Sequence, residues 1–268
     1  MAIPAVFSRN PDEWRALHDK HFMVVGNGSI GGALALMAAR SGVGQISLFD
    51  NSAVKEENLG RTFYSLATVG KLKVHALKDL ILEVNPQAVV STYSGDFRKL
   101  IHEGFVVNRT TSLLIGATDS FACQSLINVL SLETNSPALF VSCWGAATVG
   151  EILYVKPGQT PCYNCYADFR HTAEETVDDS QKYFDPDVDS TRTASQPGLW
   201  SNVLIICGFA FQVALALVGN GATAFMDDTH NLFIVNAGDF NSNLPFWAVS
   251  KGLVRRGCAV CEEAKSTE

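Results

Sequence analysis

The sequence predicts an α/β fold built on a Rossmann-like, doubly wound and largely parallel sheet, and two observations support this prediction. Short apolar runs such as HFMVVG (residues 21–26) and QISLFD (residues 45–50) alternate with stretches of helical periodicity. A glycine-rich turn joins the first apolar run to the helix that follows it. Because parallel strands need a crossover connection, usually a helix, this alternation is typical of a doubly wound sheet.

Local signals define the elements of the first half. A helix is predicted over GGALALMAARSG (residues 31–42), where the final glycine ends it. A second helix is predicted over about residues 71–84, where Asn85 and Pro86 stop it. The same reasoning predicts strands at residues 88–94, 112–119 and 138–144, and a helix at residues 120–133.

The C-terminal part has a different pattern. VGEILYVKPG (residues 149–158) and HNLFIVNAG (residues 230–238) have the character of half-buried strands between glycine and proline turns, which predicts mixed or antiparallel pairing. LWSNVLIICGFAFQVALALVG (residues 199–219) is long enough to cross a bilayer, but Ser201 and Gln212 interrupt it and no basic cluster flanks it. We therefore expect a buried core helix and no membrane partner.

Composition narrows the classes of function. The chain has 268 residues, 47% of them apolar, so we expect one domain over residues 1–268 with a sizeable core and a helical arm at residues 1–20. The formal net charge of −7 argues against a nucleic-acid partner. The arm lacks the features of a secretory signal, which predicts a cytoplasmic location. The seven cysteines are an odd number, which in a reducing compartment favours metal binding over disulfides.

The glycine-rich turn has the pattern of a phosphate-binding loop. Gly26 permits the tight turn after the strand, Gly28 lets backbone amides approach a phosphate, and Gly31 lets the helix pack closely on the sheet. Asp50, at the end of the next strand, is placed to accept hydrogen bonds from ribose hydroxyls. This pattern alone does not distinguish NAD, FAD, S-adenosylmethionine and ATP.

The residues after Asp50 favour a triphosphate. Asn58 and Arg61 follow it closely, and Lys73 stands at the start of the next predicted helix. Cations there neutralise charge that grows on the phosphates when pyrophosphate leaves. Asp119 ends an apolar strand, where one carboxylate can hold Mg²⁺; the alternative is that Asp119 caps the helix beginning near residue 121.

This ordered set of motifs resembles the ThiF/MoeB/HesA adenylyltransferases, the superfamily that includes the ubiquitin-activating enzymes. The resemblance covers roughly residues 20–261 and implies a single adenylation domain that uses ATP and Mg²⁺ to activate a C-terminal carboxylate. It implies that Asp50 binds ribose and Asp119 binds magnesium. It also implies that Asn58, Arg61 and Lys73 bind the triphosphate. Thr62 stands where the family usually has glutamine.

The resemblance also implies partners. The expected substrate is a ubiquitin-like or sulfur-carrier protein with a C-terminal glycine, or a short peptide. A homodimer is expected, with Arg9 or Arg15 as candidates to reach the site of the second copy. Members that form a thioester carry a cysteine in a crossover loop, and residues 166–197 contain none, so we expect adenylation without a conventional catalytic cysteine. The acidic residues 168–193 are interpreted either as a solvated insertion or as a loop that closes over the substrate tail.

Two pairs of cysteines with CxxC spacing predict a metal site. Four thiolates are the number that a closed tetrahedral Zn²⁺ site requires, and their wide separation in the chain matches the family's pattern. The alternative is a pair of redox motifs. The remaining cysteines, Cys123, Cys143 and Cys207, are expected to be buried and inert. The predicted zinc ligands are Cys162, Cys165, Cys258 and Cys261.

Two other classes of function remain open. A nucleotide-dependent oxidoreductase shares the glycine loop and Asp50, but it leaves Arg61, Lys73 and Asp119 unexplained. An inactive scaffold subunit keeps the fold and the zinc site but has no need of the residues that contact phosphate.

Overall fold

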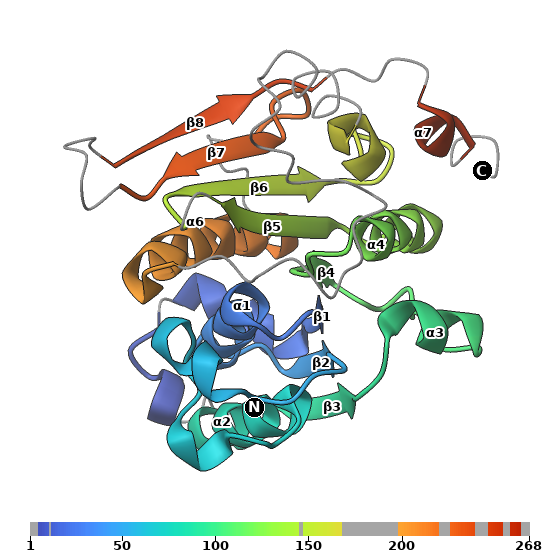
Figure 1. Ribbon diagram of the computed structural model, residues 1–268. Coiled ribbons are helices and arrows are strands. Elements are labelled where there is room, and N and C mark those ends of the chain that lie inside the picture. Colours follow the sequence, from blue (N-terminus) through green and yellow to red (C-terminus); the bar gives the residue numbers. More distant parts are fainter. Residues whose placement is uncertain are drawn as a thin grey trace.

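The computed structural model describes residues 5–10, 12–144, 147–167, 198–219, 226–238, 246–253 and 258–263. One eight-stranded sheet runs through the molecule in the order β3-β2-β1-β4-β5-β6-β7-β8 (Figure 1). The predictions for the acidic segment and the crossover loop fall largely on residues 168–197, outside the described residues.

The strands divide into a parallel half and an antiparallel half. β3, β2, β1, β4 and β5 pair in parallel, whereas β5, β6, β7 and β8 pair antiparallel. This confirms the predicted parallel sheet with an antiparallel C-terminal part. The strands are β1 (His21–Val25), β2 (Gln45–Phe49), β3 (Val89–Tyr93), β4 (Leu113–Gly116), β5 (Ala138–Trp144), β6 (Val149–Val155), β7 (Leu232–Asn236) and β8 (Trp247–Lys251).

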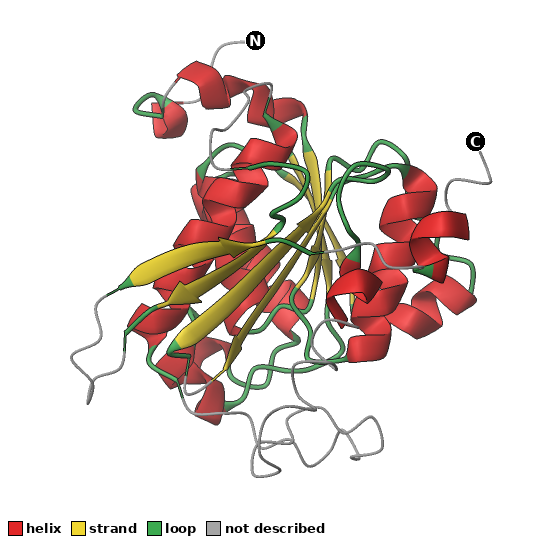
Figure 2. Cartoon of the chain, turned by 90° about the horizontal axis from the view of Figure 1, so that it is seen from above, coloured by secondary structure: helices red, strands yellow, loops and turns green. Residues whose placement is uncertain are grey.

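Helices cover both faces of the sheet (Figure 2). One face is covered by α1 (Ser29–Arg40), α2 (Lys73–Val84) and α6 (Trp200–Val218), which contribute to a single apolar core. The other face is covered by α3 (Phe97–His102) and α4 (Phe121–Thr134), and the cysteine-bearing segments join them in a second core. Other helices in the described part of the chain include α7 (Ala259–Glu263) and the 3-10 helices η1 (Ala5–Phe7), η2 (Asp12–Asp19), η3 (Glu56–Arg61) and η4 (Leu66–Thr68).

The central strands β1 and β4 are mostly apolar because both of their faces are buried. In β1, Phe22 and Val24 belong to the core under α1, whereas Met23 and Val25 belong to the core under α4. Alternate side chains of a strand point to opposite faces, so a strand that is covered on both sides has no polar face. The short apolar runs in the sequence therefore predicted these strands correctly.

The long apolar helix α6 is a core helix, as predicted. It is the one helix in the described part of the chain that is long and apolar enough to cross a membrane, and 56% of its most apolar window is buried inside the protein. It packs against α1 and against β6, where a Cβ on Gly150 would lie 2.6 Å from the Ile206 side chain. The absence of a side chain at Gly150 lets the helix approach the sheet.

The order of strands places a topological switch point at the carboxyl end of the parallel half, and we call the region outside these strand ends the crevice. β1 has β2 on one side and β4 on the other, so the chain connections turn in opposite directions between β1 and β4. Ligands of open α/β sheets bind at such a switch point, outside the carboxyl ends of the strands. The glycine loop after β1 and the turn after β4 both lie at this edge.

The structure contains elements that the sequence analysis did not predict, among them α3 and β8. Helix α3 begins after Asp96, whose carboxylate accepts hydrogen bonds from the backbone amides of Arg98 and Lys99 at 2.9 and 3.3 Å. By contrast, η3 lies between β2 and α2, in the stretch that was expected to form a loop and a short helix. β8 forms the edge of the sheet, and every residue in it is exposed, so its sequence carries no alternation of apolar and polar residues.

Candidate nucleotide site and cysteine cluster

The tight turn at Gly26 and the close packing at Gly31 are confirmed by the structure. Gly26 has φ +88°, and a Cβ there would overlap the carbonyl oxygen of Ala117. A Cβ on Gly31 would overlap the carbonyl oxygen of Gly26. Gly28 is the N-cap residue of α1, makes no side-chain cap, and faces space with no atom within 4 Å of an added Cβ. The first amides of α1 therefore face an open position that suits an anion.

Asp50 lies beside this loop and holds it in place. Its Oδ2 accepts a hydrogen bond from the Asn27 amide at 2.7 Å. Its Oδ1 accepts bonds from the amide and the hydroxyl of Ser52, at 2.8 and 2.5 Å. The carboxylate thus connects the glycine loop to the segment after β2. A carboxylate has about four acceptor positions, so these three bonds leave capacity for a ribose hydroxyl.

A buried tyrosine, missed by the sequence analysis, connects three segments of the site. Tyr64 is 5% exposed, and its hydroxyl lies 2.9 Å from the Asn27 carbonyl and 3.3 Å from the Lys73 carbonyl, to which it donates. Burial raises the pKa of Tyr64, and the negative charge of Asp50 raises it further. The sequence offered one clue, a tyrosine three residues after Arg61. A tyrosine that is buried near a site usually donates its hydroxyl to a nearby acceptor.

Tyr64→Phe is expected to loosen this connection. Losing the hydroxyl removes the donor to the buried Asn27 carbonyl and a longer contact to the Lys73 carbonyl, which should lower the free energy of unfolding by about 1–2 kcal/mol. ATP affinity should fall several-fold, because the glycine loop and Lys73 lose their common link. Urea unfolding and titration calorimetry with ATP measure the two effects.

The matched control is Tyr93→Phe, since Tyr93 stacks on Phe49 with ring centroids 4.5 Å apart and needs no hydroxyl for that contact. Equal losses of ATP affinity in both variants would contradict the role given to Tyr64.

The short helix η3 places Asn58 and Arg61. The Asn58 side-chain oxygen accepts a hydrogen bond from the Lys55 amide at 3.1 Å, so one end of this side chain is used to cap the helix. Thr62, at the position where the resemblance implies a glutamine, is buried and donates to the Asn58 carbonyl at 2.9 Å. Its hydroxyl therefore stabilises the end of η3.

The charges of Arg61 and Asp119 both influence the pKa of one thiol, that of Cys143. Cys143 lies at the carboxyl end of β5 and is half-buried. Burial raises the pKa of Cys143, the nearby Asp119 carboxylate raises it further, and the Arg61 guanidinium lowers it. The fold thus brings η3 and the turn after β4 to one neighbourhood. The prediction of a buried thiol at Cys143 was wrong because β5 extends beyond β4 to the open crevice; Cys123 and Cys207 are buried as predicted.

The alternative role for Asp119, as a helix cap, was wrong. Helix α4 begins at Phe121, so the N-cap position is Ser120, and the Ser120 hydroxyl accepts a hydrogen bond from the Cys123 amide at 3.3 Å. Asp119 is exposed, and within the described residues no hydrogen bond or ion pair holds its carboxylate. The carboxylate is therefore available to a ligand at the crevice.

Lys73 lies beside the segment that follows Asp50, whereas Arg9 and Arg15 belong to the N-terminal arm. Lys73 is the first residue of α2, and its amide donates to the Ser52 carbonyl at 3.0 Å. The arm packs at the opposite edge of the sheet, where the Asn10 amide group donates to the carbonyl at the end of α1 at 3.3 Å. An α-helix of this length spans about 18 Å, which separates the arm from the crevice of its own chain.

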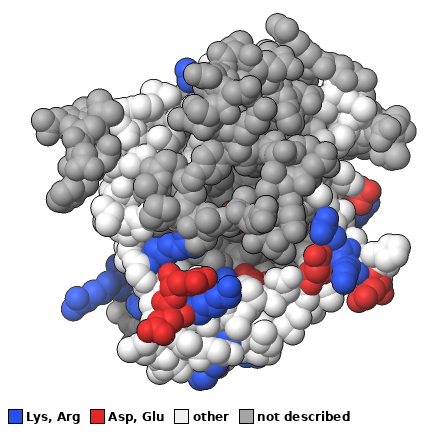
Figure 3. All heavy atoms as spheres, in the orientation of Figure 1, with Lys and Arg blue, Asp and Glu red and all other residues white. Residues whose placement is uncertain are grey.

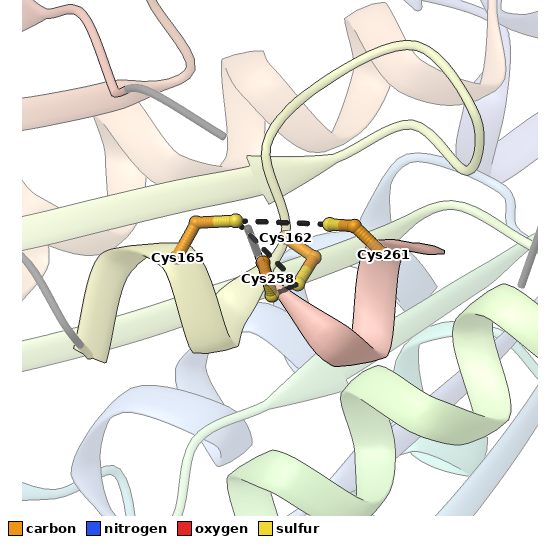
Figure 4. Close-up of side chains that lie close together, drawn as sticks. All are labelled: Cys162, Cys165, Cys258 and Cys261. Carbon is orange, nitrogen blue, oxygen red and sulfur yellow. Dashed lines mark hydrogen bonds between the residues drawn. The ribbon is translucent and has the colours of Figure 1, made fainter. Parts of the chain in front are cut away.

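The four paired cysteines form one buried cluster (Figure 4). Their sulfur atoms all lie within 4.8 Å of one another, and the shortest separations are 4.0, 3.9 and 3.7 Å. Four sulfurs 2.3 Å from a central zinc lie about 3.8 Å apart, whereas a disulfide needs about 2.05 Å. The arrangement fits a tetrahedral metal site formed by Cys162, Cys165, Cys258 and Cys261.

Asn128 supports the cluster from α4. It is fully buried, its oxygen accepts from the Tyr163 amide at 3.0 Å, and its nitrogen donates to Asn164 at 3.1 Å. Hydrogen bonds from Cys165 and then Cys261 hold the pKa of Cys162 below its usual value. Hydrogen bonds with Cys162 in turn raise the pKa values of Cys165 and Cys261, so the first thiolate of the cluster forms at Cys162, on a rigid backbone that suits a metal ligand. A single asparagine on an apolar helix gave no sequence signal of this role.

The glycine loop, the polar crevice and the cysteine cluster define a Rossmann-like α/β protein of the nucleotide-binding class with a metal-type cysteine site. The model of the ThiF family matches residues 5–226. The chain belongs to the ThiF family.

Several curated relatives are ubiquitin-like modifier-activating enzymes. The chain is 28% identical over 163 residues to ubiquitin-like modifier-activating enzyme 5 of Caenorhabditis elegans, covering 58% of this chain and 39% of the relative. It is 27% identical over 163 residues to the enzyme of the same name in Drosophila mojavensis, covering 57% and 41%. The match thus spans about two fifths of the length of these relatives.

Solved structures share the fold. MccB of E. coli with MccA-N7isoASN has a TM-score of 0.70 at 19% identity, covering 93% of this chain and 69% of that one. MccB of E. coli with ATP has a TM-score of 0.69 at 18% identity, covering 97% and 76%. PaaA has a TM-score of 0.65 at 19% identity, covering 91% and 67%.

Proposed function

We propose that this protein is an ATP-dependent adenylyltransferase that converts the C-terminal carboxylate of a protein or peptide into an acyl-adenylate. The observation that carries the proposal is that the glycine loop after β1 and Asp119 after β4 lie at one edge of the sheet, beside the amino end of α1. Arg61 and Asp119 are both near enough to Cys143 to influence the pKa of its thiol. An oxidoreductase needs the glycine loop and Asp50 but has no use for this charged pair. A scaffold needs neither.

The reaction is an in-line displacement at phosphorus. A carboxylate oxygen of the substrate attacks the α-phosphorus of ATP, the bond from that phosphorus to the bridging oxygen breaks, and pyrophosphate leaves. The amides at the start of α1 bind phosphate, and Asp50 accepts from the ribose. Asn58, Arg61 and Lys73 hold the triphosphate, where the two cations stabilise charge on the leaving group.

Asp119 is the residue that fits a magnesium ligand, because its exposed carboxylate lies at the crevice and is not held by another described side chain. When bound, Mg²⁺ neutralises phosphate charge. Arg61 complements it from the opposite segment. The protein contributes position and charge and no covalent nucleophile.

The substrate class proposed is a ubiquitin-like protein, a sulfur-carrier protein or a short peptide. The names of the curated relatives and the MccA-bound MccB structures support this choice. Because residues 166–197 contain no cysteine, the acyl group passes to sulfur or an amine without a thioester on that segment. We place the protein in the reducing cytoplasm, where cysteines stay reduced and can serve as metal ligands.

We further propose a homodimer and a structural zinc. Arg9 and Arg15 lie far from the crevice of their own chain, so any contact with a phosphate must come from a second copy. The zinc at the cysteine cluster would join the end of the chain to its middle. Basic and acidic side chains are mixed on the face shown in Figure 3, which favours protein or peptide over nucleic acid as the partner.

Pyrophosphate exchange tests the proposal. Labelled pyrophosphate should enter ATP only when a substrate with a free C-terminal carboxylate is present, since the back reaction needs an acyl-adenylate. Small proteins ending in glycine and short synthetic peptides are compared with the same molecules carrying a C-terminal amide, which should give no exchange. Tight NAD or FAD binding without exchange would favour an oxidoreductase, and absence of ATP binding would favour a scaffold.

A further inference from the structure

The turn that carries Asp119 is held by a buried glutamine. Gln124 lies in α4, is 5% exposed, and donates from its Nε2 to the Thr118 carbonyl oxygen at 2.9 Å. The Thr118 hydroxyl in turn accepts from the Ser120 amide at 3.3 Å. The residues immediately before and after Asp119 are therefore both fixed.

The end of β4 has room for this amide because it is a glycine. A Cβ on Gly116 would overlap the Gln124 side-chain oxygen and would lie 2.8 Å from the Phe140 ring. Gly116 is fully enclosed between β1 and β5, so a displaced amide would have nowhere to move. Gly116 and Gln124 form one fitted pair.

Keeping glutamine at this position has an energetic cost. The side-chain oxygen of Gln124 is buried and, among the described residues, accepts no hydrogen bond. A buried acceptor without a donor destabilises a fold, and an apolar side chain would avoid that loss. Glutamine at this position lowers the stability of the fold compared with an apolar residue. The hydrogen bond from Gln124 to the turn of Asp119 is the best explanation for its presence.

The same turn is also fixed on its other side. The Ala117 amide donates to the Val25 carbonyl at 2.9 Å, and Ala117 packs against both Gly26 and Gly31 of the phosphate loop. The two ends of the turn thus connect the glycine loop, through Ala117, to helix α4, through Thr118. Asp119 itself has no such support, so its direction depends on this backbone.

We propose that Gln124 is a positioning residue that fixes the Asp119 carboxylate toward the crevice for metal binding. The inference rests on the proposed function, since it gives Asp119 the role of a magnesium ligand. Gln124 contacts neither substrate nor metal. It acts through the Thr118 carbonyl oxygen.

The test is Gln124→Met, which keeps the length of the side chain and removes the donor. The concentration of Mg²⁺ that half-saturates pyrophosphate exchange should rise at least fivefold, while the rate at saturating Mg²⁺ falls less. Mn²⁺ binding in the presence of a non-hydrolysable ATP analogue, measured by electron paramagnetic resonance, should weaken by a similar factor. Amide hydrogen exchange at residues 117–119 should accelerate.

The matched control is Ser131→Ala in the same helix. The buried Ser131 hydroxyl donates to the Ser136 carbonyl at 2.6 Å, so this variant also loses one buried bond from a side chain to the backbone. It should lower stability without changing the dependence on metal. A purely structural role for Gln124 predicts the same outcome in both variants.

A second variant, Gln124→Glu, tests the same inference if Gln124→Met does not fold. A buried glutamate has a raised pKa, and only its protonated form donates to Thr118. Its Mn²⁺ affinity relative to wild type at the same pH should therefore improve as the pH falls. Unchanged Mn²⁺ affinity and amide exchange in folded Gln124→Met or Gln124→Glu would overturn the inference. If wild type shows no pyrophosphate exchange but these two properties still change, the proposed function fails and the positioning role stands.

Discussion

Asp119→Ala and Arg61→Ala are each expected to lower substrate-dependent pyrophosphate exchange by about a hundredfold or more while leaving the protein folded. Each removes one charged contact made to the phosphates or their metal as negative charge moves to the leaving group. Neither should disturb the fold, because Asp119 is exposed and Arg61 ends a short surface helix. Exchange rates at saturating ATP and thermal unfolding measure the two expectations.

Two exposed charges outside the crevice serve as controls. Asp79 lies in α2, and Arg40 lies at the end of α1 away from the glycine loop. Asp79→Ala and Arg40→Ala change the net charge by the same amounts as the test variants but should leave exchange within about twofold, because exposed charges beyond a Debye length are largely screened. Wild-type exchange in Asp119→Ala and Arg61→Ala would remove the catalytic assignment.

The sequence predicted the parallel half of the fold well because each signal there was local. Strands β1 and β4 are buried on both faces and read as unbroken apolar runs, and Gly26 marks a turn with positive φ. Edge strand β8 has no such local signal. Its residues are exposed and show no alternation, so no local pattern in the sequence marks its pairing with the preceding strand β7.

The site shows the same division. Asp50 and Asp119 could be predicted because each follows an apolar strand and so reaches the carboxyl edge of the sheet. Tyr64 and Gln124 could not, because their roles depend on backbone carbonyls of other segments, which no side-chain pattern records. The position of Cys143 depends on how far β5 extends beyond its neighbour β4, a matter of register and not of composition.

The purified protein is expected to contain about one zinc per chain, and Cys162→Ser is expected to lose it. A hydroxyl is a poor substitute for a thiolate ligand, and the three remaining sulfurs would no longer close a tetrahedral shell. Metal analysis of the two proteins after dialysis measures the difference. Cys123→Ser is the matched control, since Cys123 is a buried thiol in α4 outside the cluster and should leave the zinc content unchanged.

Loss of zinc should appear first as loss of stability at the end of the chain. The helix α7 carries Cys261 and has only five residues, too short to be stable alone in water. Without the metal it loses its main attachment, so amide exchange in residues 258–263 should accelerate. Binding that favours only the folded state contributes about 4 kcal/mol when free metal is about a thousand times its Kd, so the free energy of unfolding should fall by about this amount.

ATP affinity should change much less than stability. The proposed phosphate contacts come from the glycine loop, η3 and the start of α2, which belong to the core on the opposite face of the sheet from the cysteines. Asn128 ties the cysteine segment to α4 one helical turn beyond Gln124, so the part of the site closest to the cluster is the turn of Asp119. If zinc removal affects the chemistry, it should first raise the Mg²⁺ concentration that half-saturates pyrophosphate exchange. ATP affinity should fall only later. Zinc-free wild type with disulfide-bonded cysteines and unchanged stability would contradict the site.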